Sequence, residues 1–378
     1  MNKPPYPIID ADGHVREGLA IDWKARLPRE YQKWAPYMVS AGFGRDRMVF
    51  PFETPKDAPE PPVFQGGLTG GYWKGKKKEE SARRAGTYDP HARIPDMDAE
   101  GIDLAVLFGG RVGLGAAGLE DARFATCLAR IYNDWLAEYC LAYPRRLKGV
   151  AVLPVQDIEW SVQEVGRAKS LGFVGVVVPP NIRGKNLNDA SLRPVFKEAE
   201  RANLALCVHG GQGMPGQRIA GADQFDKFFY WSVLANPFEN IIALTAMIAG
   251  GVLDECPDLR VAYLEGGVGW APFFMERMDE RYEQLASQVQ CKAKPSEYIR
   301  TRCWFSGDPD EELLPEVAER IGEDRLLFAS DYFHFDSKFP DTVRLVTDRE
   351  DMPASLKRAM LCDNPARLYR LTLNGKKR

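Results

Sequence analysis

The chain has 378 residues with a formal net charge of −3, and 45% of its residues are hydrophobic. This near-neutral balance argues against a general nucleic-acid-binding or membrane-surface protein. The first residues show no signal peptide, and the longest apolar stretch, residues 241–253, is too short and glycine-broken to span a bilayer. Seven scattered cysteines without a CxxC pair are typical of a reducing compartment, so we expect a cytoplasmic protein.

Apolar segments that we predict to be strands recur along the whole chain. There are eight, at Ile8–Asp12, Ile102–Phe108, Leu147–Val155, Phe173–Pro179, Leu204–His209, Arg260–Glu265, Cys303–Gly307 and Arg325–Ser330. Most are continuous apolar runs, as in parallel strands that are covered on both faces. Amphipathic stretches such as Pro272–Leu285 lie between them and predict helices. The alternation favours an α/β fold, a single (β/α)8 TIM barrel over residues 1–378, with an open doubly wound sheet as the alternative.

The connection after the first strand is far longer than an ordinary βα loop. We expect residues 16–100 to contain an insertion or lid and the first helices of the barrel. Within it, residues 51–64 are dense in proline, and residues 65–80 are rich in glycine and end in lysines followed by two glutamates. We interpret these lysines as a solvated surface, because too few charges cluster there to bind nucleic acid.

A glycine-rich stretch, Gly109–Gly118, follows the second predicted strand. Its spacing matches neither GxGxxG with the required acidic residue nor a GK[ST] loop, so an ordinary βα loop is favoured over a phosphate-binding loop. Arg111 within it could bind a substrate carboxylate, because arginine offers a planar pair of donors.

Residues of metal-ligand type stand at the ends of four predicted strands. They are Asp12, His14, His209, Glu265, Asp331 and His334. In a parallel barrel all these ends open on one face, so we predict that the side chains meet around a metal ion. Only four histidines occur in the chain, and the remaining one, His91, is predicted to be an exposed or capping residue.

The predicted site assigns several roles. Asp12 and His14 are two residues apart on a strand and so point to the same face. A buried carboxylate at Glu265 would be costly unless it were paired or metal-bound. Asp331 could bind the ion or act as a base towards a metal-bound water. His334 could contact a substrate or serve in acid–base catalysis.

Longer motifs around these residues resemble a known family. They are IIDADGHV, YDPHARIPDMDAEGIDLAVLF, HGG, CPDLRVAYLEGGVGWAPFFMERMDERYE, LLFASDYFHFDSKFP and DNPARLYRL. Together they resemble the amidohydrolase-related family, the branch that includes aminocarboxymuconate semialdehyde decarboxylase. The resemblance implies a distorted (β/α)8 barrel that self-associates as a homo-oligomer or with a related barrel subunit. It also implies a divalent metal bound by Asp12, His14, His209 and Asp331, with Glu265 at a metal or catalytic position.

The chain departs from the family pattern in two places. The usual HxH motif of the first strand has Asp12 as its first member, and the histidine of the sixth strand is replaced by Glu265. The fourth strand, GFVGVVVPP, has no lysine to form the carbamylated bridge of dinuclear members. This harder ligand set favours Mn, Fe or Mg while leaving Zn open, with one or two ions per chain.

Three functions are open to this sequence. The first is a metal-dependent hydrolase or decarboxylase of a small carboxylated or aromatic substrate, with Asp331, His334 and Glu265 as catalytic residues. The second is a non-heme dinuclear Fe/Mn oxygenase, to which Asp308 could contribute unless it caps the following helix. The third is a non-catalytic barrel that supports a partner subunit.

Overall fold

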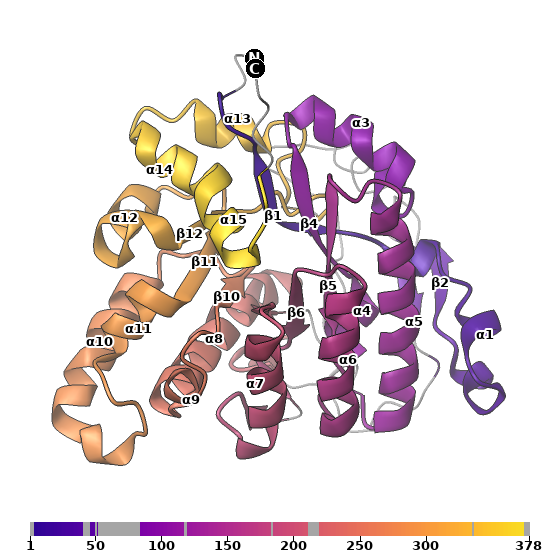
Figure 1. The fold of residues 1–378 in the computed structure, drawn as a ribbon, viewed down its shortest axis with the longest axis horizontal. Coiled ribbons are helices and arrows are strands. Elements are labelled where there is room, and N and C mark those ends of the chain that lie inside the picture. Colours follow the sequence, from indigo (N-terminus) through magenta and orange to yellow (C-terminus); the bar gives the residue numbers. More distant parts are fainter. Residues whose placement is uncertain are drawn as a thin grey trace.

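A parallel β-barrel wrapped in helices forms the body of the protein (Figure 1). The computed structural model describes residues 4–40, 46–49, 51, 84–116, 119–182, 184–210, 219–334 and 336–373. Its main sheet has eight strands in the order β1 (Ile9–His14), β4 (Leu104–Phe108), β5 (Leu147–Val152), β6 (Gly175–Val178), β9 (Ala205–His209), β10 (Val261–Leu264), β11 (Cys303–Gly307) and β12 (Leu326–Phe328). All eight predicted strands are confirmed.

The first and last strands of this sheet meet, which distinguishes a barrel from an open sheet. The backbone N–H of Asp331, just past β12, donates to the carbonyl of Asp12 in β1 at 3.1 Å. The strands are also buried along nearly their whole length, as in β4, where all five residues are buried. The predicted (β/α)8 barrel is therefore confirmed, and the open doubly wound sheet is wrong.

Helices follow most of the strands and cover the outside of the barrel (Figure 1). The longer ones are α3 (Pro90–Glu100), α5 (Ala122–Leu141), α6 (Ile158–Ser170), α7 (Arg193–Arg201), α8 (Phe228–Ala249), α10 (Ala271–Leu285), α11 (Pro295–Arg302) and α12 (Leu314–Ile321). The shorter ones are α1 (Trp23–Arg26), α4 (Arg111–Gly115), α9 (Val252–Glu255), α13 (Thr342–Thr347), α14 (Ala354–Arg358) and α15 (Asn364–Tyr369). Helix α10 confirms the helix predicted for Pro272–Leu285.

Aspartates begin several of these helices. Asp121 accepts the backbone N–H of Phe124 at 2.9 Å at the start of α5, and Asp157 accepts that of Trp160 at 3.0 Å at the start of α6. A capping carboxylate satisfies one of the N–H groups that a helix leaves free in its first turn. At these positions the aspartate marks in the sequence where the helix begins.

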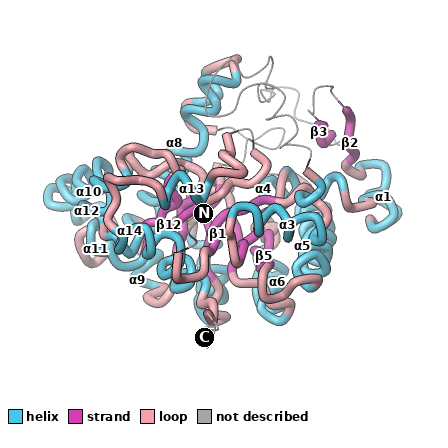
Figure 2. The backbone as a smooth tube through the Cα atoms, turned by 90° about the horizontal axis from the view of Figure 1, so that it is seen from above, coloured by secondary structure: helices cyan, strands magenta, loops and turns pink. Residues whose placement is uncertain are grey.

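An insertion separates β1 from the first barrel helix, α3, as predicted. Its described part contains α1, a hairpin of β2 (Tyr37–Ser40) and β3 (Asp46–Val49), and short 3-10 turns. The hairpin and α1 lie at one edge of the barrel (Figure 2). The proline-dense and glycine-rich segments of residues 52–83 lie outside the described residues, and with them most of the predicted lid and its lysines. The boundaries 16–100 stay a prediction.

Helix α8 is the one helix of the described chain that is long and apolar enough to cross a membrane. Its 22 residues include a window of mean hydropathy 1.3, of which 39% is buried within the protein. The later turns pack on the barrel through residues such as Leu244 and Met247, which are fully buried. The first turns expose Phe229 and Val233 and stand out beyond the ring of helices (Figure 2).

Candidate metal centre

The six residues predicted to meet at the strand ends do lie together. The Nε2 atom of His14 is 3.4 Å from Oδ1 of Asp12 and 3.4 Å from Oδ1 of Asp331. The Nε2 atom of His209 is 3.4 Å from Oδ2 of Asp12 and 3.4 Å from Oε2 of Glu265. Carboxylates from β1, from the end of β10 and from the end of β12 therefore surround two imidazoles.

His334 closes this cluster on its open side. Its Nδ1 atom lies 2.5 Å from Oδ1 of Asp331 and 3.6 Å from Oε1 of Glu265. Its ring centroid is 4.1 Å from that of His14. Asp12, His14 and His209 are almost inaccessible to water, whereas Glu265, Asp331 and His334 are 20–25% exposed. The cluster thus has a buried floor and an accessible rim.

The buried floor contains polar atoms whose bonding capacity is unused. Oδ1 of Asp12, Nε2 of His14 and Nε2 of His209 are buried and have no hydrogen-bond partner among the described residues. A buried polar atom without a partner costs about 1–3 kcal/mol, so three in one place call for a ligand. Two imidazole nitrogens and a carboxylate oxygen are suitable ligands for a divalent cation.

Backbone carbonyls orient both imidazoles for such a role. Nδ1 of His14 lies 3.2 Å from the carbonyl oxygen of Gly109, and Nδ1 of His209 lies 2.5 Å from that of Gly210. A carbonyl oxygen only accepts hydrogen bonds, so Nδ1 carries the hydrogen in each ring. In the neutral form of each ring the lone pair is therefore on Nε2, which faces the centre of the cluster, as in many protein metal sites.

The strand ends adopt unusual backbone conformations at this site. Glu265, Asp331 and Phe333 have φ angles of 52°, 47° and 75°, in the left-handed region that residues other than glycine rarely adopt. Such conformations each cost of order 1–3 kcal/mol and gather at functional sites. The hydrogen bond from Glu265 N–H to Oγ of Ser306, at 3.0 Å, stabilises one of them.

Mutual interactions shift the pKa values of the cluster in the absence of a metal. Burial lowers the pKa of His14 well below its usual value, so this ring is neutral. Burial also opposes the charge on His209, but Asp12 and Glu265 outweigh it and raise the pKa of His209 to about 9. Burial raises the pKa of Glu265 to about 8. For Asp331, burial would raise the pKa, but the charge of His334 holds it below the usual range.

Metal binding should therefore depend on pH. His209 is protonated below about pH 9 in the metal-free protein and must lose that proton to offer its Nε2 lone pair. As the pH rises from 6 to 8, we expect the Kd for Mn²⁺ to fall by about tenfold per pH unit for each proton that binding releases. Calorimetric titrations in buffers of different ionisation enthalpy measure both the Kd and the number of protons released on binding. A Kd that does not change with pH, without proton release, would contradict this assignment.

Comparison with known proteins identifies the family. Residues 9–371 match the family model described as amidohydrolase. The chain belongs to the amidohydrolase family. It is 32% identical over 250 residues to 2-amino-3-carboxymuconate-6-semialdehyde decarboxylase of Dictyostelium discoideum, covering 65% of this chain and 67% of that protein. It is 28% identical over 279 residues to gamma-resorcylate decarboxylase of a Rhizobium species, covering 71% and 82% respectively.

Solved structures support the amidohydrolase barrel. An amidohydrolase of Mycobacterium avium subsp. paratuberculosis aligns with a TM-score of 0.77 at 22% identity, covering 98% of this chain and all of the other. The 5-carboxyvanillate decarboxylase of Novosphingobium aromaticivorans, solved with bound manganese, aligns with a TM-score of 0.69 at 24% identity and covers 97% of each chain. The family match and the decarboxylase relatives confirm the predicted family and an amidohydrolase-related enzyme. The solved structures confirm its barrel fold.

The carboxylate of Glu17 occupies the backbone N–H groups of the glycine-rich stretch that was compared with phosphate-binding loops. The carboxylate of Glu17 accepts the backbone N–H of Gly110 at 2.8 Å and that of Val112 at 2.7 Å. These N–H groups at the start of α4 are the ones that a phosphate would need. Arg111 is the first residue of α4, at the end of β4, and its side chain lies outside the described residues. Its contact with a substrate stays a prediction.

Two further predictions can be compared with the structure. His91 is exposed on α3, where its Nδ1 lies 3.0 Å from the hydroxyl of Tyr143, so it does not belong to the centre. The interpretation of Asp308 as a helix cap is wrong, because α12 begins only at Leu314. Asp308 instead directly follows β11, and its side chain is exposed.

Three charged residues near the centre were missed from the sequence. Asp336 lies two residues after His334 with its side chain exposed, and its carboxylate interacts with that of Asp331. Arg93 of α3 is buried and donates to the carbonyl of His14 at 2.7 Å. Asp10 is fully buried two residues before Asp12. Only Asp10 had a recognisable sequence feature, since an aspartate inside an apolar strand needs a partner.

Proposed function

We propose that this chain is a metal-dependent decarboxylase of a small aromatic or otherwise unsaturated carboxylate. The observation that carries the proposal is the set of unpartnered buried atoms on Asp12, His14 and His209, beneath an accessible rim of Asp331 and His334. The names of the two curated relatives described above, both decarboxylases, support the reaction class. Enzymes with this barrel generally carry out their chemistry at the carboxyl ends of the strands, which also supports the proposal.

A single ion fits this centre better than two. Among the described residues, two groups of side chains could hold an ion, Asp12–His14–His209 and His14–Glu265–Asp331–His334, and both contain His14. Because the two groups share a ligand, they describe one place. Three carboxylates in the set favour Mn²⁺ over softer metals. We therefore propose Asp12, His14, His209 and Asp331 as ligands of one Mn²⁺, with Glu265 beside it.

The side chains of the rim would handle the proton that decarboxylation requires. Decarboxylation breaks the bond between the carboxylate group and the substrate carbon that bears it. CO₂ leaves, the electron pair stays on the substrate carbon, and that carbon then takes up a proton. A bound divalent ion supplies Lewis-acid polarisation of the substrate oxygens. His334, partly exposed and paired with Asp331 at 2.5 Å, is placed to hold a proton and deliver it.

Aromatic and cationic groups at the rim support an aromatic carboxylate as substrate. The ring of Phe333 stands edge-on to His14 at 6.3 Å and to His334 at 4.9 Å between centroids. The guanidinium of Arg16 lies over the Phe333 ring, 4.9 Å from its centroid. Phe333 is itself buried, so the arginine is the group that would pair with the carboxylate of such a substrate, through its planar pair of donors.

The decisive test measures metal, oxygen and CO₂ in one preparation. Protein loaded with Mn²⁺ is analysed for metal content and then incubated with 2,6-dihydroxybenzoate or 5-carboxyvanillate. We expect about one Mn²⁺ per chain, metal-dependent release of CO₂ and no consumption of O₂. Two iron ions with O₂ consumption would support the oxygenase hypothesis instead, and water-dependent cleavage without CO₂ would support a hydrolase. A protein without stoichiometric metal would refute the decarboxylase, oxygenase and hydrolase hypotheses alike.

A further inference from the structure

The barrel closes between its first and last strands without the usual ladder of backbone hydrogen bonds. Among the described strands, β1 pairs only with β4, and β12 pairs only with β11. One backbone bond, from the N–H of Asp331 to the carbonyl of Asp12 at 3.1 Å, crosses this seam, and the carboxylate of Asp10 adds two more bonds to it. Its Oδ1 accepts the backbone N–H of Ser330 at 2.9 Å, and its Oδ2 accepts the hydroxyl of Ser330 at 2.6 Å. This side chain therefore connects β1 to the residue that precedes Asp331.

A bulge in β1 explains why Asp10 can do this. Asp10 is opposite Ala105 and Gly13 is opposite Leu107, so three steps along β1 correspond to two along β4. The extra residue reverses the alternation of side chains. Asp10 consequently faces α3, where it lines a small cavity with Arg93 and Glu100, while His14 faces the metal centre.

Asp10 also forms hydrogen bonds to the main chain beside candidate ligands on both sides of the seam. Asp10 also accepts the backbone N–H of Asp12 at 3.3 Å. A Cβ on Gly13 would lie 2.6 Å from Oδ2 of Asp10 and 2.7 Å from Nη2 of Arg93, so only glycine leaves room for both groups at this point. One buried carboxylate thus binds the main chain of one candidate ligand, Asp12, and that of Ser330, which precedes another, Asp331.

We propose that Asp10 is a positioning residue that sets the separation of Asp12 and Asp331 across the barrel seam, and so determines how tightly the metal is bound. The inference rests on the proposed metal site but not on the reaction. Asp331 has a left-handed backbone, with φ of 47°, and directly follows Ser330. Such a conformation persists only where neighbouring contacts hold it, and the bonds from Ser330 to Asp10 are such contacts. Residues that orient metal ligands typically contribute a factor of about 10–100 in metal affinity.

Glu100 provides a matched control. It is also buried, lines the same cavity, and accepts the hydroxyl of Thr342 at 2.6 Å and the backbone N–H of Thr342 at 3.1 Å. It connects α3 to α13, away from the metal ligands. Removal of Glu100 should therefore destabilise the fold as removal of Asp10 does, without moving any ligand.

The test compares Mn²⁺ titrations of Asp10→Ala and Glu100→Ala with those of the wild type. We expect Asp10→Ala to raise the Kd for Mn²⁺ by about 10–100-fold and Glu100→Ala to change it less than about twofold, although both lower Tm. Asp10→Asn should restore wild-type affinity, because its amide can still accept from Ser330 N–H and donate to the hydroxyl. The visible absorption spectrum of Co²⁺-loaded Asp10→Ala should also differ from that of the wild type.

Equal Kd values in Asp10→Ala and Glu100→Ala would overturn the inference, as would an unchanged Co²⁺ spectrum. If Asp10→Ala does not fold, Ser330→Ala takes its place. That variant removes one of the two hydrogen bonds, and a Kd equal to that of Glu100→Ala would likewise count against the inference. A wild-type protein that fails to bind Mn²⁺ would instead refute the proposed metal centre, so the two failures can be told apart.

Discussion

Replacement of His209 by alanine should abolish stoichiometric metal binding and lower turnover by about a thousandfold or more, because loss of a Lewis acid removes several kcal/mol of transition-state stabilisation. His209 is fully buried, with its Nε2 between Asp12 and Glu265 and without a hydrogen-bond partner. Its removal leaves those two carboxylates facing each other without a cation. Metal analysis after dialysis and CO₂ release measure the two effects.

Circular dichroism should show that the His209→Ala variant keeps the fold, because the barrel core does not depend on this one side chain. Asp12→Ala should lose the metal in the same way. His91→Ala is a suitable control, since His91 is the exposed histidine of α3 and lies away from the centre. Unchanged metal content in both His209→Ala and Asp12→Ala would refute the proposed ligand set.

Replacement of His334 by alanine should have a different result: the metal stays and turnover is lost. His334 lies at the rim, where its Nδ1 is 2.5 Å from Asp331, and it is partly exposed to an incoming substrate. General acid–base groups typically contribute a factor of about 10²–10⁴ in rate. We expect kcat to fall within that range while KM changes little, because the group acts on the transition state.

Steady-state kinetics on Mn²⁺-loaded His334→Ala, together with its metal content, measure this effect. His334→Gln serves as a control for ring packing against His14, because it keeps bulk and hydrogen bonding without a titratable proton. Full activity in either variant would remove His334 from the mechanism. Loss of the metal along with activity would reclassify it as a ligand.

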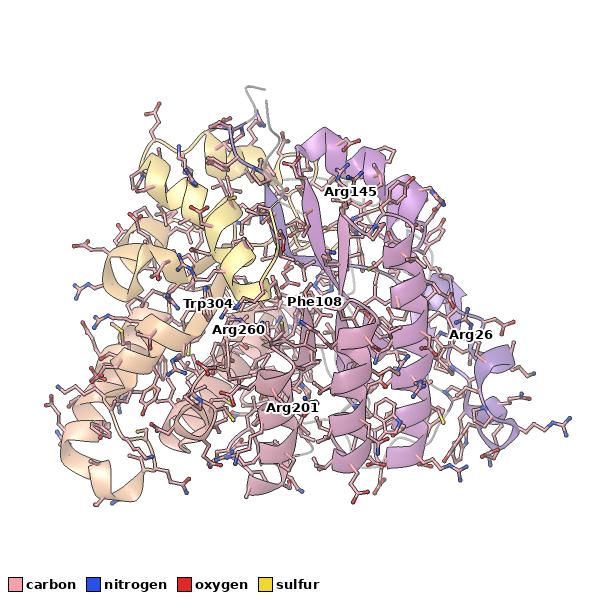
Figure 3. The ribbon with its side chains drawn as sticks, viewed as in Figure 1. Arg26, Phe108, Arg145, Arg201, Arg260 and Trp304 are labelled. Carbon is pink, nitrogen blue, oxygen red and sulfur yellow. The ribbon has the colours of Figure 1, made fainter. Side chains whose placement is uncertain are left out.

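The barrel and the composition of its site could be predicted from sequence because both depend on local patterns. Apolar runs of β-sheet length mark the strands, and parallel strands bring their carboxyl ends to one face. Asp12, His209 and Asp331 therefore had to converge once the fold was correct. The ring of Phe108, which ends β4 and lies in the middle of the barrel in Figure 3, has its centroid 5.3 Å from that of His209, which ends β9, as expected when strand ends meet on one barrel face.

Other parts of the site could not be predicted, because they depend on contacts that no local pattern encodes. The bulge that turns Asp10 towards α3 depends on pairing with β4, and the buried position of Arg93 depends on how α3 packs. The sequence equally allowed Asp308 to cap a helix, whose true start at Leu314 depends on the loop after β11. The left-handed backbone at Glu265 and Asp331 is likewise set by tertiary contacts.

The seam between β1 and β12 also has a consequence for the order in which the chain folds. Asp10 and Ser330 are 320 residues apart, so this contact closes one of the largest loops that the chain can make. Contacts of such long range form slowly and after local ones, so the seam should be among the last features to appear. Ligands from β1 and from the end of β12 would then bind the ion together only after the barrel has closed, and the bound ion would stabilise the closed barrel.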